Sequence, residues 1–377
     1  MVRKFLFRYR KILGEGGYYC RKKEKLLSFL TQTVHIQLTG YKESVYSKLM
    51  SKEIFKVDFH GVRGSIPRPL LGEEIEEKLI RAFQRARPEN LVNKNSIKSF
   101  VKGLPHEIRG TFGGNSSCVS MQVGSKLLIF DAGSGIRVLG ESLMKTGFNR
   151  GEGKANLFFS HTHWDHILGI PFFAPFYIEG NQFTLHSPLP DIKKRLEGQQ
   201  KPKYFPVPFC DYASSIDFVV LKDKREHKIG NAVITWKEQY HPGKCFAYRV
   251  DYKGRSVVYA TDSEYKKQES KNFKSTVDFF RDADLLIFDS MYTLTKSLAE
   301  KEGWGHSTAF TGIDLAVKAN VKQIAFFHHE PTHNDFKLVD ILHQTKKHLE
   351  KVAPKQSLKM FLSYEGLSVN LLSPSPK

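Results

Sequence analysis

Four potential metal ligands fall within one short segment of the chain. Directly after the apolar run Leu157–Phe159 come His161, His163, Asp165 and His166. The run predicts a buried strand, so we expect the polar cluster on the turn at its carboxyl end. Alternate side chains of such a turn can point to opposite sides, so the first two histidines would bind one ion and the other pair a second. Imidazole and carboxylate without thiolate favour Zn²⁺, Mn²⁺, Fe or Ni²⁺ and argue against a closed structural zinc site.

Residues of the same chemical types recur where other predicted strands end. The predicted strands at 232–240, 256–260 and 324–327 lead into His241, into Asp262, and into the adjacent pair His328 and His329. A further predicted strand, at 126–130, leads into Asp131. A single histidine at a strand end is more often structural than a ligand, so each of these residues alone is weak evidence. Their order along the chain is what makes them informative.

This order resembles the metallo-β-lactamase superfamily, whose His-x-His-x-Asp-His signature stands here at residues 161–166. The resemblance covers about residues 54–370 and implies an α/β fold, a four-layer αββα sandwich. It also implies a ligand set: His161, His163 and His241 for one ion, Asp165, His166 and His328 for the other, and Asp262 between them. We prefer His328 because it directly follows the apolar strand, and His329 is the alternative.

Further motifs resemble the phosphodiesterase and transfer-RNA 3′-processing branches of this superfamily. They are Gly61-Val62-Arg63-Gly64-Ser65-Ile66-Pro67, Gly113-Gly114-Asn115-Ser116-Ser117, Asp131-Ala132-Gly133-Ser134-Gly135 and Gly305-His306-Ser307-Thr308. The set looks most like bacterial cyclic-nucleotide phosphodiesterases. It implies that Asp131 supports the metal loop without binding metal, and that Asn115 and Ser65 lie around the ligands or against the substrate. His306 is expected to act as general acid or as a phosphate clamp.

The implied reaction is hydrolysis of a phosphodiester at two divalent ions, with zinc expected first and manganese or iron as alternatives. A hydroxide that bridges the ions would attack phosphorus, oriented by Asp165. The preferred substrate is a small nucleotide, above all a 3′,5′-cyclic nucleotide. The alternative is RNA, cleaved by a 3′-end-processing endonuclease or exonuclease. Asp262 in place of a cysteine argues against antibiotic hydrolysis, and His163, where di-iron members carry glutamate, argues against redox chemistry.

The charge of the chain favours an anionic partner. Its 377 residues include 58 Lys and Arg against 39 Asp and Glu, a net charge of +19. This excess suits RNA, whereas the lack of a long Gly/Pro-rich arm of the kind that holds transfer RNA argues against it. A rival interpretation is a protein that binds nucleic acid or a membrane surface through its basic first 50 residues, with the metal site incidental. The fold also allows a homodimer, although no stretch identifies an interface.

The sequence predicts a basic amino-terminal extension over residues 1–50 and a hydrolase domain over residues 51–377. The extension carries helical patterns at 23–30 and 42–50 and a strand pattern at 33–38. The domain contains a helical insertion at about 68–110, with a helix at 73–87 closed by Arg87-Pro88 and Asn-rich sequence. Aromatic and proline-rich stretches at 171–176 and 204–208 predict either core packing or an apolar wall for a nucleobase.

Cysteine usage and hydropathy predict a cytoplasmic protein. Cys20, Cys118, Cys210 and Cys245 are far apart and form neither a Cys-x-x-Cys motif nor a disulfide framework. No segment approaches 18 consecutive apolar residues, and the basic start lacks the apolar stretch of a secretory signal.

Overall fold

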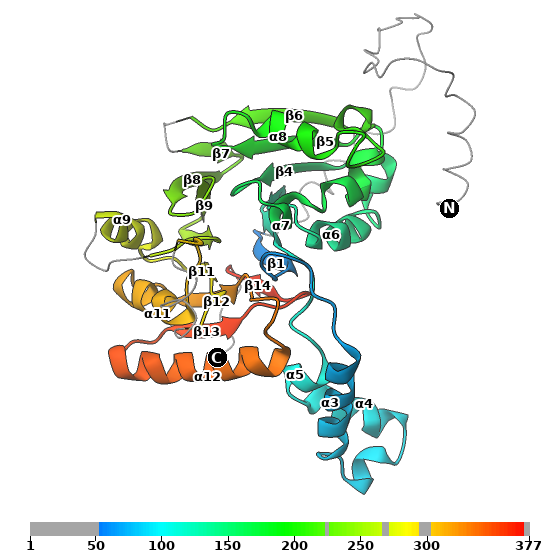
Figure 1. The fold of residues 1–377 in the computed structure, drawn as a ribbon, viewed down its shortest axis with the longest axis vertical. Coiled ribbons are helices and arrows are strands. Elements are labelled where there is room, and N and C mark those ends of the chain that lie inside the picture. Colours follow the sequence, from blue (N-terminus) through cyan, green and yellow to red (C-terminus); the bar gives the residue numbers. More distant parts are fainter. Residues whose placement is uncertain (1–52, 223–225, 266–270, 294–302, 373–377) are drawn as a thin grey trace, which may run out of the picture.

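The computed structural model describes residues 53–222, 226–265, 271–293 and 303–372. In these ranges the chain forms two mixed β-sheets that pack face to face, with helices on the outer sides (Figure 1). This arrangement confirms the predicted αββα sandwich. The segments predicted at 23–30, 33–38 and 42–50 lie outside the described residues.

Each sheet has seven strands in the described part of the chain. The first has the order β14 (Ser368–Asn370), β1 (Phe55–Gly61), β2 (Cys118–Val123), β3 (Lys126–Phe130), β4 (Lys154–Phe158), β5 (Gln182–Ser187) and β6 (Ser215–Val220). The second has the order β13 (Lys359–Leu362), β12 (Gln323–Phe327), β11 (Leu285–Asp289), β10 (Arg255–Ala260), β9 (Cys245–Tyr252), β8 (Ala232–Gln239) and β7 (His227–Ile229).

The helices cover the two outer faces. Along the first sheet lie α6 (Gly135–Leu143), α7 (Trp164–Ile167) and α8 (Ile192–Gln199), and along the second lie α9 (Lys271–Phe280), α11 (Ala309–Lys318) and α12 (Asp335–Val352). Short 3₁₀ helices are η1 (Pro88–Leu91), η2 (Gly147–Arg150), η3 (Ile170–Phe172), η4 (Ala174–Tyr177) and η5 (Phe209–Asp211). None of the described helices combines the length and apolar character needed to cross a bilayer.

The side-chain pattern of each strand follows from its place in the sandwich. In β1, Phe55, Val57 and Phe59 are buried, and the residues between them are only partly covered. This alternation places one face of the strand in the core between the sheets. Every residue of β11 is buried instead, because its sheet is covered on both faces.

Parallel pairing brings the ends of several strands together. β3 pairs in parallel with β4, and β10 pairs in parallel with β11, which pairs in parallel with β12. Neighbouring parallel strands end on the same side of a sheet. The residues that follow β3, β4, β10, β11 and β12 therefore meet at one edge of the sandwich.

The predicted insertion contains more helix than the sequence suggested. Its helices are α3 (Gly72–Phe83), η1, α4 (Lys94–Gly103) and α5 (His106–Arg109). Helix α3 ends before the predicted residue 87, since the residue before Pro88 is disfavoured in α-helical conformation. The Asn-rich sequence starts α4 rather than only closing a helix: the side-chain oxygen of Asn93 accepts hydrogen bonds from the backbone N–H groups of Asn95 and Ser96.

A buried ionic network ties the insertion to the main body. Asp335, at the start of α12, lies 2.6 Å from Nζ of Lys78 on α3 and 3.7 Å from the guanidinium of Arg63. The Arg63 side chain is fully buried and also donates hydrogen bonds to the carbonyl oxygens of Gly113 and His333. Because Arg63 follows β1 directly, this network holds the chain at the point where it leaves the first sheet.

Removing the central carboxylate should destabilise the fold. We expect Asp335→Ala to lower the free energy of unfolding by roughly 3–5 kcal/mol, because two buried cations lose their partner. Denaturant unfolding measures this loss. Asp340→Ala on the same helix is the control, since its pair with Lys337 is about half exposed and should contribute less than about 1 kcal/mol. Equal losses for the two variants would contradict the proposed role of the network.

Candidate metal centre

In the described part of the chain, four overlapping groups of potential metal-binding side chains form at the shared edge of the strands. Two of these groups combine His306 either with His241 and Asp262 or with Asp289 and His328, and the remaining two are called the first and the second cluster. His161, His163 and His241 make the first, and Asp165, His166, Asp262 and His328 make the second. In each cluster one ligand atom from every residue lies within 4.8 Å of all the others. The structure thus brings together the seven residues that the superfamily resemblance implied. The first cluster has the three expected histidines, and the second contains Asp262 in addition to the three residues expected there.

Asp262 lies between the two clusters. Its Oδ2 is 3.6 Å from Nε2 of His161 and 3.8 Å from Nε2 of His241. Its Oδ1 is 3.2 Å from Nε2 of His166 and 3.3 Å from Nε2 of His328. One carboxylate oxygen therefore faces each cluster, which is the geometry that a bridging ligand requires.

Four residues of this edge adopt left-handed backbone conformations. They are Ser65 (φ 59°), Asp131 (φ 59°), Asp262 (φ 43°) and His328 (φ 58°). Each lies just beyond the end of a strand, and Asp131 and His328 follow β3 and β12 immediately. A non-glycine residue in this region costs roughly 1–2 kcal/mol, and such conformations cluster at functional sites. Here they turn polar side chains out of the strand direction and into the centre.

The choice between the adjacent histidines follows from the contacts of each ring. His328 has its Nε2 3.0 Å from Oδ2 of Asp165, inside the second cluster. His329 points the other way, and its Nε2 donates to the carbonyl oxygen of Ser363 at 3.0 Å. The His328 ring packs against Gly64, where a larger residue would not fit, because a Cβ atom on residue 64 would lie 2.5 Å from the ring.

Asp131 orients the second cluster from behind. Its Oδ2 lies 2.7 Å from Nδ1 of His166, and it accepts hydrogen bonds from the hydroxyl groups of Ser160 and Tyr259. With Nδ1–H donating to this carboxylate, Nε2 of His166 presents its lone pair to the cluster. The sequence predicted the supporting role of Asp131 but not the contributions of Ser160 and Tyr259, because only the packing of the two sheets brings Tyr259 across.

Histidine 241 is oriented in the same way by a backbone group. Its Nδ1 donates to the carbonyl oxygen of Gly305 at 2.9 Å, so that Nε2 faces the first cluster. Residue 305 must be glycine here, because its φ is +83° and a Cβ atom would lie 2.2 Å from Nδ1 of His241. The Gly-His-Ser-Thr motif thereby supports a residue of the first cluster as well as presenting His306.

The charge balance of the centre suits two divalent cations. Burial works against charge on His328, but Asp262, Asp165 and Asp289 outweigh it and raise its pKa to about 10. Burial likewise opposes ionisation of Asp262, whereas the imidazoles of His328 and His166 hold its pKa well below the usual value. The Nε2 atoms of His161 and His166 are buried without a hydrogen-bond partner. Five imidazoles and two carboxylates are a donor set that zinc, manganese or iron accepts.

The other two predicted supporting residues lie near the centre in different ways. The backbone N–H of Ser65 donates to Oδ2 of Asp165 at 2.7 Å, so this residue contacts the second cluster through its main chain. Asn115 lies further back, where its side chain donates to Glu365 and accepts from the hydroxyl of Ser134. Asn115 therefore holds neighbouring loops together.

His306 lies beside the clusters and forms a pair that the sequence analysis missed. Its Nδ1 is 2.9 Å from Oδ2 of Asp289, which is fully buried at the end of β11. Burial would raise the pKa of Asp289, but the imidazoles of His306 and His328 lower it below the usual value. Asp289 stays a carboxylate and fixes the His306 ring. The signal was present in the sequence, since Asp289 follows an apolar strand as Asp262 does.

The aromatic stretches divide between core and surface. Phe173 and Phe176 are fully buried and belong to the core, whereas Phe172 and Tyr204 are more than half exposed. The most exposed aromatic side chain in the described part of the chain is Trp164, at 82%, which lies between His163 and Asp165. Trp304 precedes Gly305 and is also exposed. Exposed aromatic faces therefore adjoin the centre, which sequence patterns alone did not indicate.

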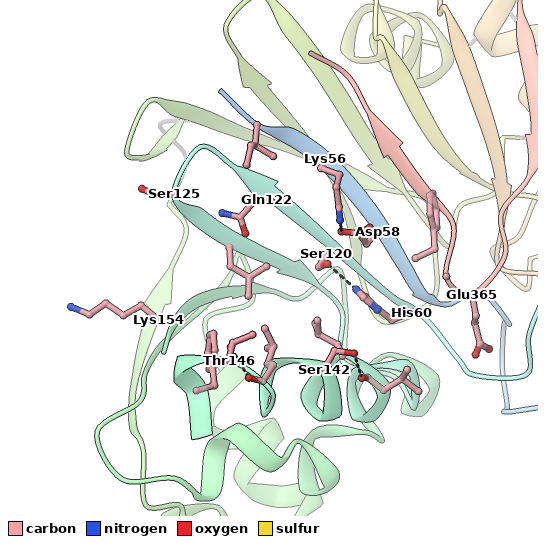
Figure 2. A pocket seen from close by; sticks show the side chains of 18 residues that line it. Lys56, Asp58, His60, Ser120, Gln122, Ser125, Ser142, Thr146, Lys154 and Glu365 are labelled. Atoms are coloured by element: carbon pink, nitrogen blue, oxygen red, sulfur yellow. Dashed lines mark hydrogen bonds and ion pairs between the residues drawn. The ribbon is translucent and has the colours of Figure 1, made fainter. Parts of the chain in front are cut away.

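A separate cavity of about 700 Å³ lies between α6 and the outer face of the first sheet. Figure 2 shows Lys56, Asp58 and His60 of β1 beside it, with the imidazole of His60 hydrogen bonded to Ser120. Burial lowers the pKa of His60 to about 4. No residue of the two clusters lines this cavity, so it is distinct from the metal centre.

Two packed mixed sheets with clustered histidines and aspartates beyond their strand ends define a metal-dependent hydrolase of the α/β sandwich type. A family model described as a beta-lactamase superfamily domain matches residues 128–329. The chain belongs to this superfamily, as its motifs predicted.

Relatives and solved structures agree with this assignment. Ribonuclease Z of Picrophilus torridus is 28% identical over 330 residues, which cover 76% of this chain and 89% of that protein. The human short-form tRNase Z has a similar fold, with a TM-score of 0.51 at 14% identity over 83% of this chain and 98% of that one. Yeast PDE1 has a TM-score of 0.54 at 12% identity over 85% of this chain and all of that one.

Adjacent substitutions test the assignment of the second cluster. We expect His328→Ala to lower the bound zinc or manganese per chain by about one ion, because a cluster residue is lost. We expect His329→Ala to keep the full metal content and to lose only stability, since its buried ring bonds to Ser363. Elemental analysis of the purified variants measures this. Metal loss from His329→Ala alone would reverse the assignment.

Proposed function

We propose that this chain is a two-metal phosphodiesterase that cleaves RNA during 3′-end processing. The observation that carries the reaction class is the His306–Asp289 pair beside the two clusters. Hydrolysis of a phosphodiester needs a proton for the departing oxygen and stabilisation of charge on the phosphoryl oxygens. The pair offers an imidazole held in one orientation for that task.

The seven cluster residues, His161, His163, Asp165, His166, His241, Asp262 and His328, would hold two divalent ions. Such ions lower the pKa of a shared water and polarise a phosphoryl oxygen. Asp165 is held in place by Ser65 N–H and by His328, so its carboxylate can orient the attacking water. His306 has its Nδ1 fixed by Asp289, which leaves Nε2 to carry the proton toward the departing oxygen.

Four features favour RNA over a single small nucleotide. The curated relatives that match the chain, including that of Picrophilus torridus, are named Ribonuclease Z, and the net charge of +19 attracts a polyanion. Close to the centre, the guanidinium of Arg195 on α8 donates to the Thr162 hydroxyl at 3.0 Å, between two cluster histidines. A cation at that position suits a phosphate that neighbours the cleaved one, and exposed Trp164 offers a face on which a base can stack.

A 3′,5′-cyclic nucleotide is the second candidate substrate. It is supported by the resemblance of the Gly-His-Ser-Thr motif to cyclic-nucleotide phosphodiesterases, while the similarity to yeast PDE1 concerns the fold alone. A cyclic nucleotide carries one phosphate and would need no further cation at the rim. Only the RNA candidate therefore gives the Arg195 side chain a role in substrate binding.

A substrate panel separates the candidates. The full chain, loaded separately with zinc and with manganese, is incubated with a transfer RNA that carries a 3′ extension, with cyclic AMP and with cyclic GMP. We expect cleavage of the RNA, and a several-fold weaker apparent affinity for RNA in Arg195→Ala, because one phosphate contact is lost. Asp165→Ala is the blank. Turnover of a cyclic nucleotide without RNA cleavage would establish the second candidate instead, and turnover of neither would refute both.

The role of the His306–Asp289 pair has its own test. We expect His306→Ala to lower kcat by about 10²–10⁴-fold, the range for loss of a general acid or base, with metal content unchanged. Asp289→Asn should lower kcat less, because the imidazole remains but is no longer held by a carboxylate. His348→Ala is a matched control, since His348 pairs with Asp314 at 2.8 Å on helices that face away from the centre. A fully active His306→Ala variant would remove His306 from the mechanism.

A further inference from the structure

The insertion exposes an unusual amount of apolar surface. Most of the exposed large apolar side chains in the described ranges lie on it or at its start, namely Ile66, Leu71, Ile75, Leu79, Ile80, Phe83, Leu91, Val92, Ile97 and Val101. Figure 1 shows α3 and α4 projecting from the two-sheet body. Large contiguous apolar patches on a protein surface usually mark a site of association.

Helix α3 turns its apolar side chains toward solvent, in contrast to an ordinary surface helix. Its buried residues are Glu74 and Lys78, which pair with Arg68 and Asp335. Its apolar residues Ile75, Leu79 and Phe83, spaced four apart, are 47%, 55% and 68% exposed. An amphipathic helix normally turns its apolar stripe toward the core. The apolar stripe of α3 is held toward solvent by ionic contacts on the opposite face.

The charges along α3 indicate what covers the stripe. Exposed Glu73 and Glu76 stand in its first half, and exposed Arg85 and Arg87 follow its end. The acidic half would repel the phosphates of RNA or of anionic lipid. Two copies of α3 packed antiparallel would instead set the acidic end of each against the basic end of the other.

The spacing of the apolar residues fits the same arrangement. Ile75 and Phe83 are equally far along the chain from Leu79. A twofold axis through Leu79 would therefore place Ile75 of one copy against Phe83 of the second, with Leu79 against its own counterpart. A surface that is complementary to itself is what a twofold homodimer needs.

We propose that the exposed face of α3 is a homodimer interface, formed with a second copy of this chain. The remaining exposed apolar residues of η1 and α4 extend the same projecting lobe. The contacts of Lys78 with Asp335 and with the carbonyl oxygens of Glu107 and Gly110 hold α3 in place before association, which lowers the entropy lost on binding. This interface is independent of the reaction assigned to the metal centre.

Sedimentation and light scattering of the full chain test the proposal. We expect a dimer for the unaltered protein and a monomer for Leu79→Glu, because a carboxylate on the twofold axis meets its own copy in an apolar contact. Val352→Glu is the control, since Val352 is a similarly exposed apolar residue, at 47%, on α12 outside the insertion; this variant should stay dimeric. Circular dichroism and metal content of Leu79→Glu should match the unaltered protein.

A monomeric unaltered protein, or a Leu79→Glu variant that remains dimeric, would overturn the proposal. Flotation with vesicles that contain anionic lipid tests whether a membrane covers this face instead. If the unaltered protein is monomeric and binds the vesicles, and Leu79→Glu does not bind them, the face belongs to a membrane contact and the dimer is refuted.

A covalent test locates the axis. In a background with Cys20 and Cys210 replaced by serine, Leu79→Cys should form an intermolecular disulfide on mild oxidation, because its counterpart lies opposite. Val352→Cys should not. Linkage through Val352→Cys but not through Leu79→Cys would place the contact outside α3.

Discussion

The structure depends on carboxylate and imidazole groups that lie close together at one edge of the sandwich. Asp131, Asp165, Asp262 and Asp289 lie there with less than about a tenth of their surface exposed, among imidazoles of which that of His163 is exposed and those of His161, His166 and His328 are buried. Buried carboxylates are unfavourable unless they are paired. Neighbouring imidazoles lower the pKa values of Asp165, Asp262 and Asp289 against the effect of burial, and two divalent cations would add further positive charge. The close pairing of carboxylates with imidazoles is thus what allows these charged groups to be buried.

The pairing of strands within the two sheets brings these carboxylate and imidazole groups together. Parallel pairing of β10, β11 and β12 places Asp262, Asp289 and His328 side by side, and pairing of β3 with β4 brings Asp131 to the loop of His166. Left-handed turns at several of these positions direct the side chains inward. The strained residues follow the buried carboxyl-terminal ends of β3, β10 and β12, where the surrounding packing holds the backbone.

The same edge is connected to the insertion through the chain that leaves β1. Arg63 is anchored to Asp335, and two residues later Ser65 donates its N–H to Asp165. Asp335 also holds Lys78 of α3. The short chain from Arg63 to Ser65 therefore connects the ionic network that holds α3 with a residue of the second cluster. The superfamily assignment accounts for the sandwich fold, and the helices α3 and α4 project from it (Figure 1).

Much of this protein could be predicted from its sequence by local chemistry. The run of His161, His163, Asp165 and His166 after an apolar strand, and the later strand ends with His241, Asp262 and His328, were sufficient for the superfamily and the candidate ligands. Such signals can be recognised in a sequence because a set of metal ligands requires particular residue types at short spacings. The strands with clear apolar runs, such as β10 and β12, were placed within about a residue for the same reason.

The tertiary structure decided what depends on residues far apart in the sequence. Only packing could show that His328 enters the second cluster while His329 turns to Ser363, that Tyr259 reaches Asp131 across the two sheets, and that Asp289 holds His306. The inverted face of α3 also escaped sequence analysis, because periodicity shows that a helix has an apolar stripe but not which way the stripe points. That direction was set by the pairing of Lys78 with Asp335, a contact between residues separated by most of the hydrolase domain.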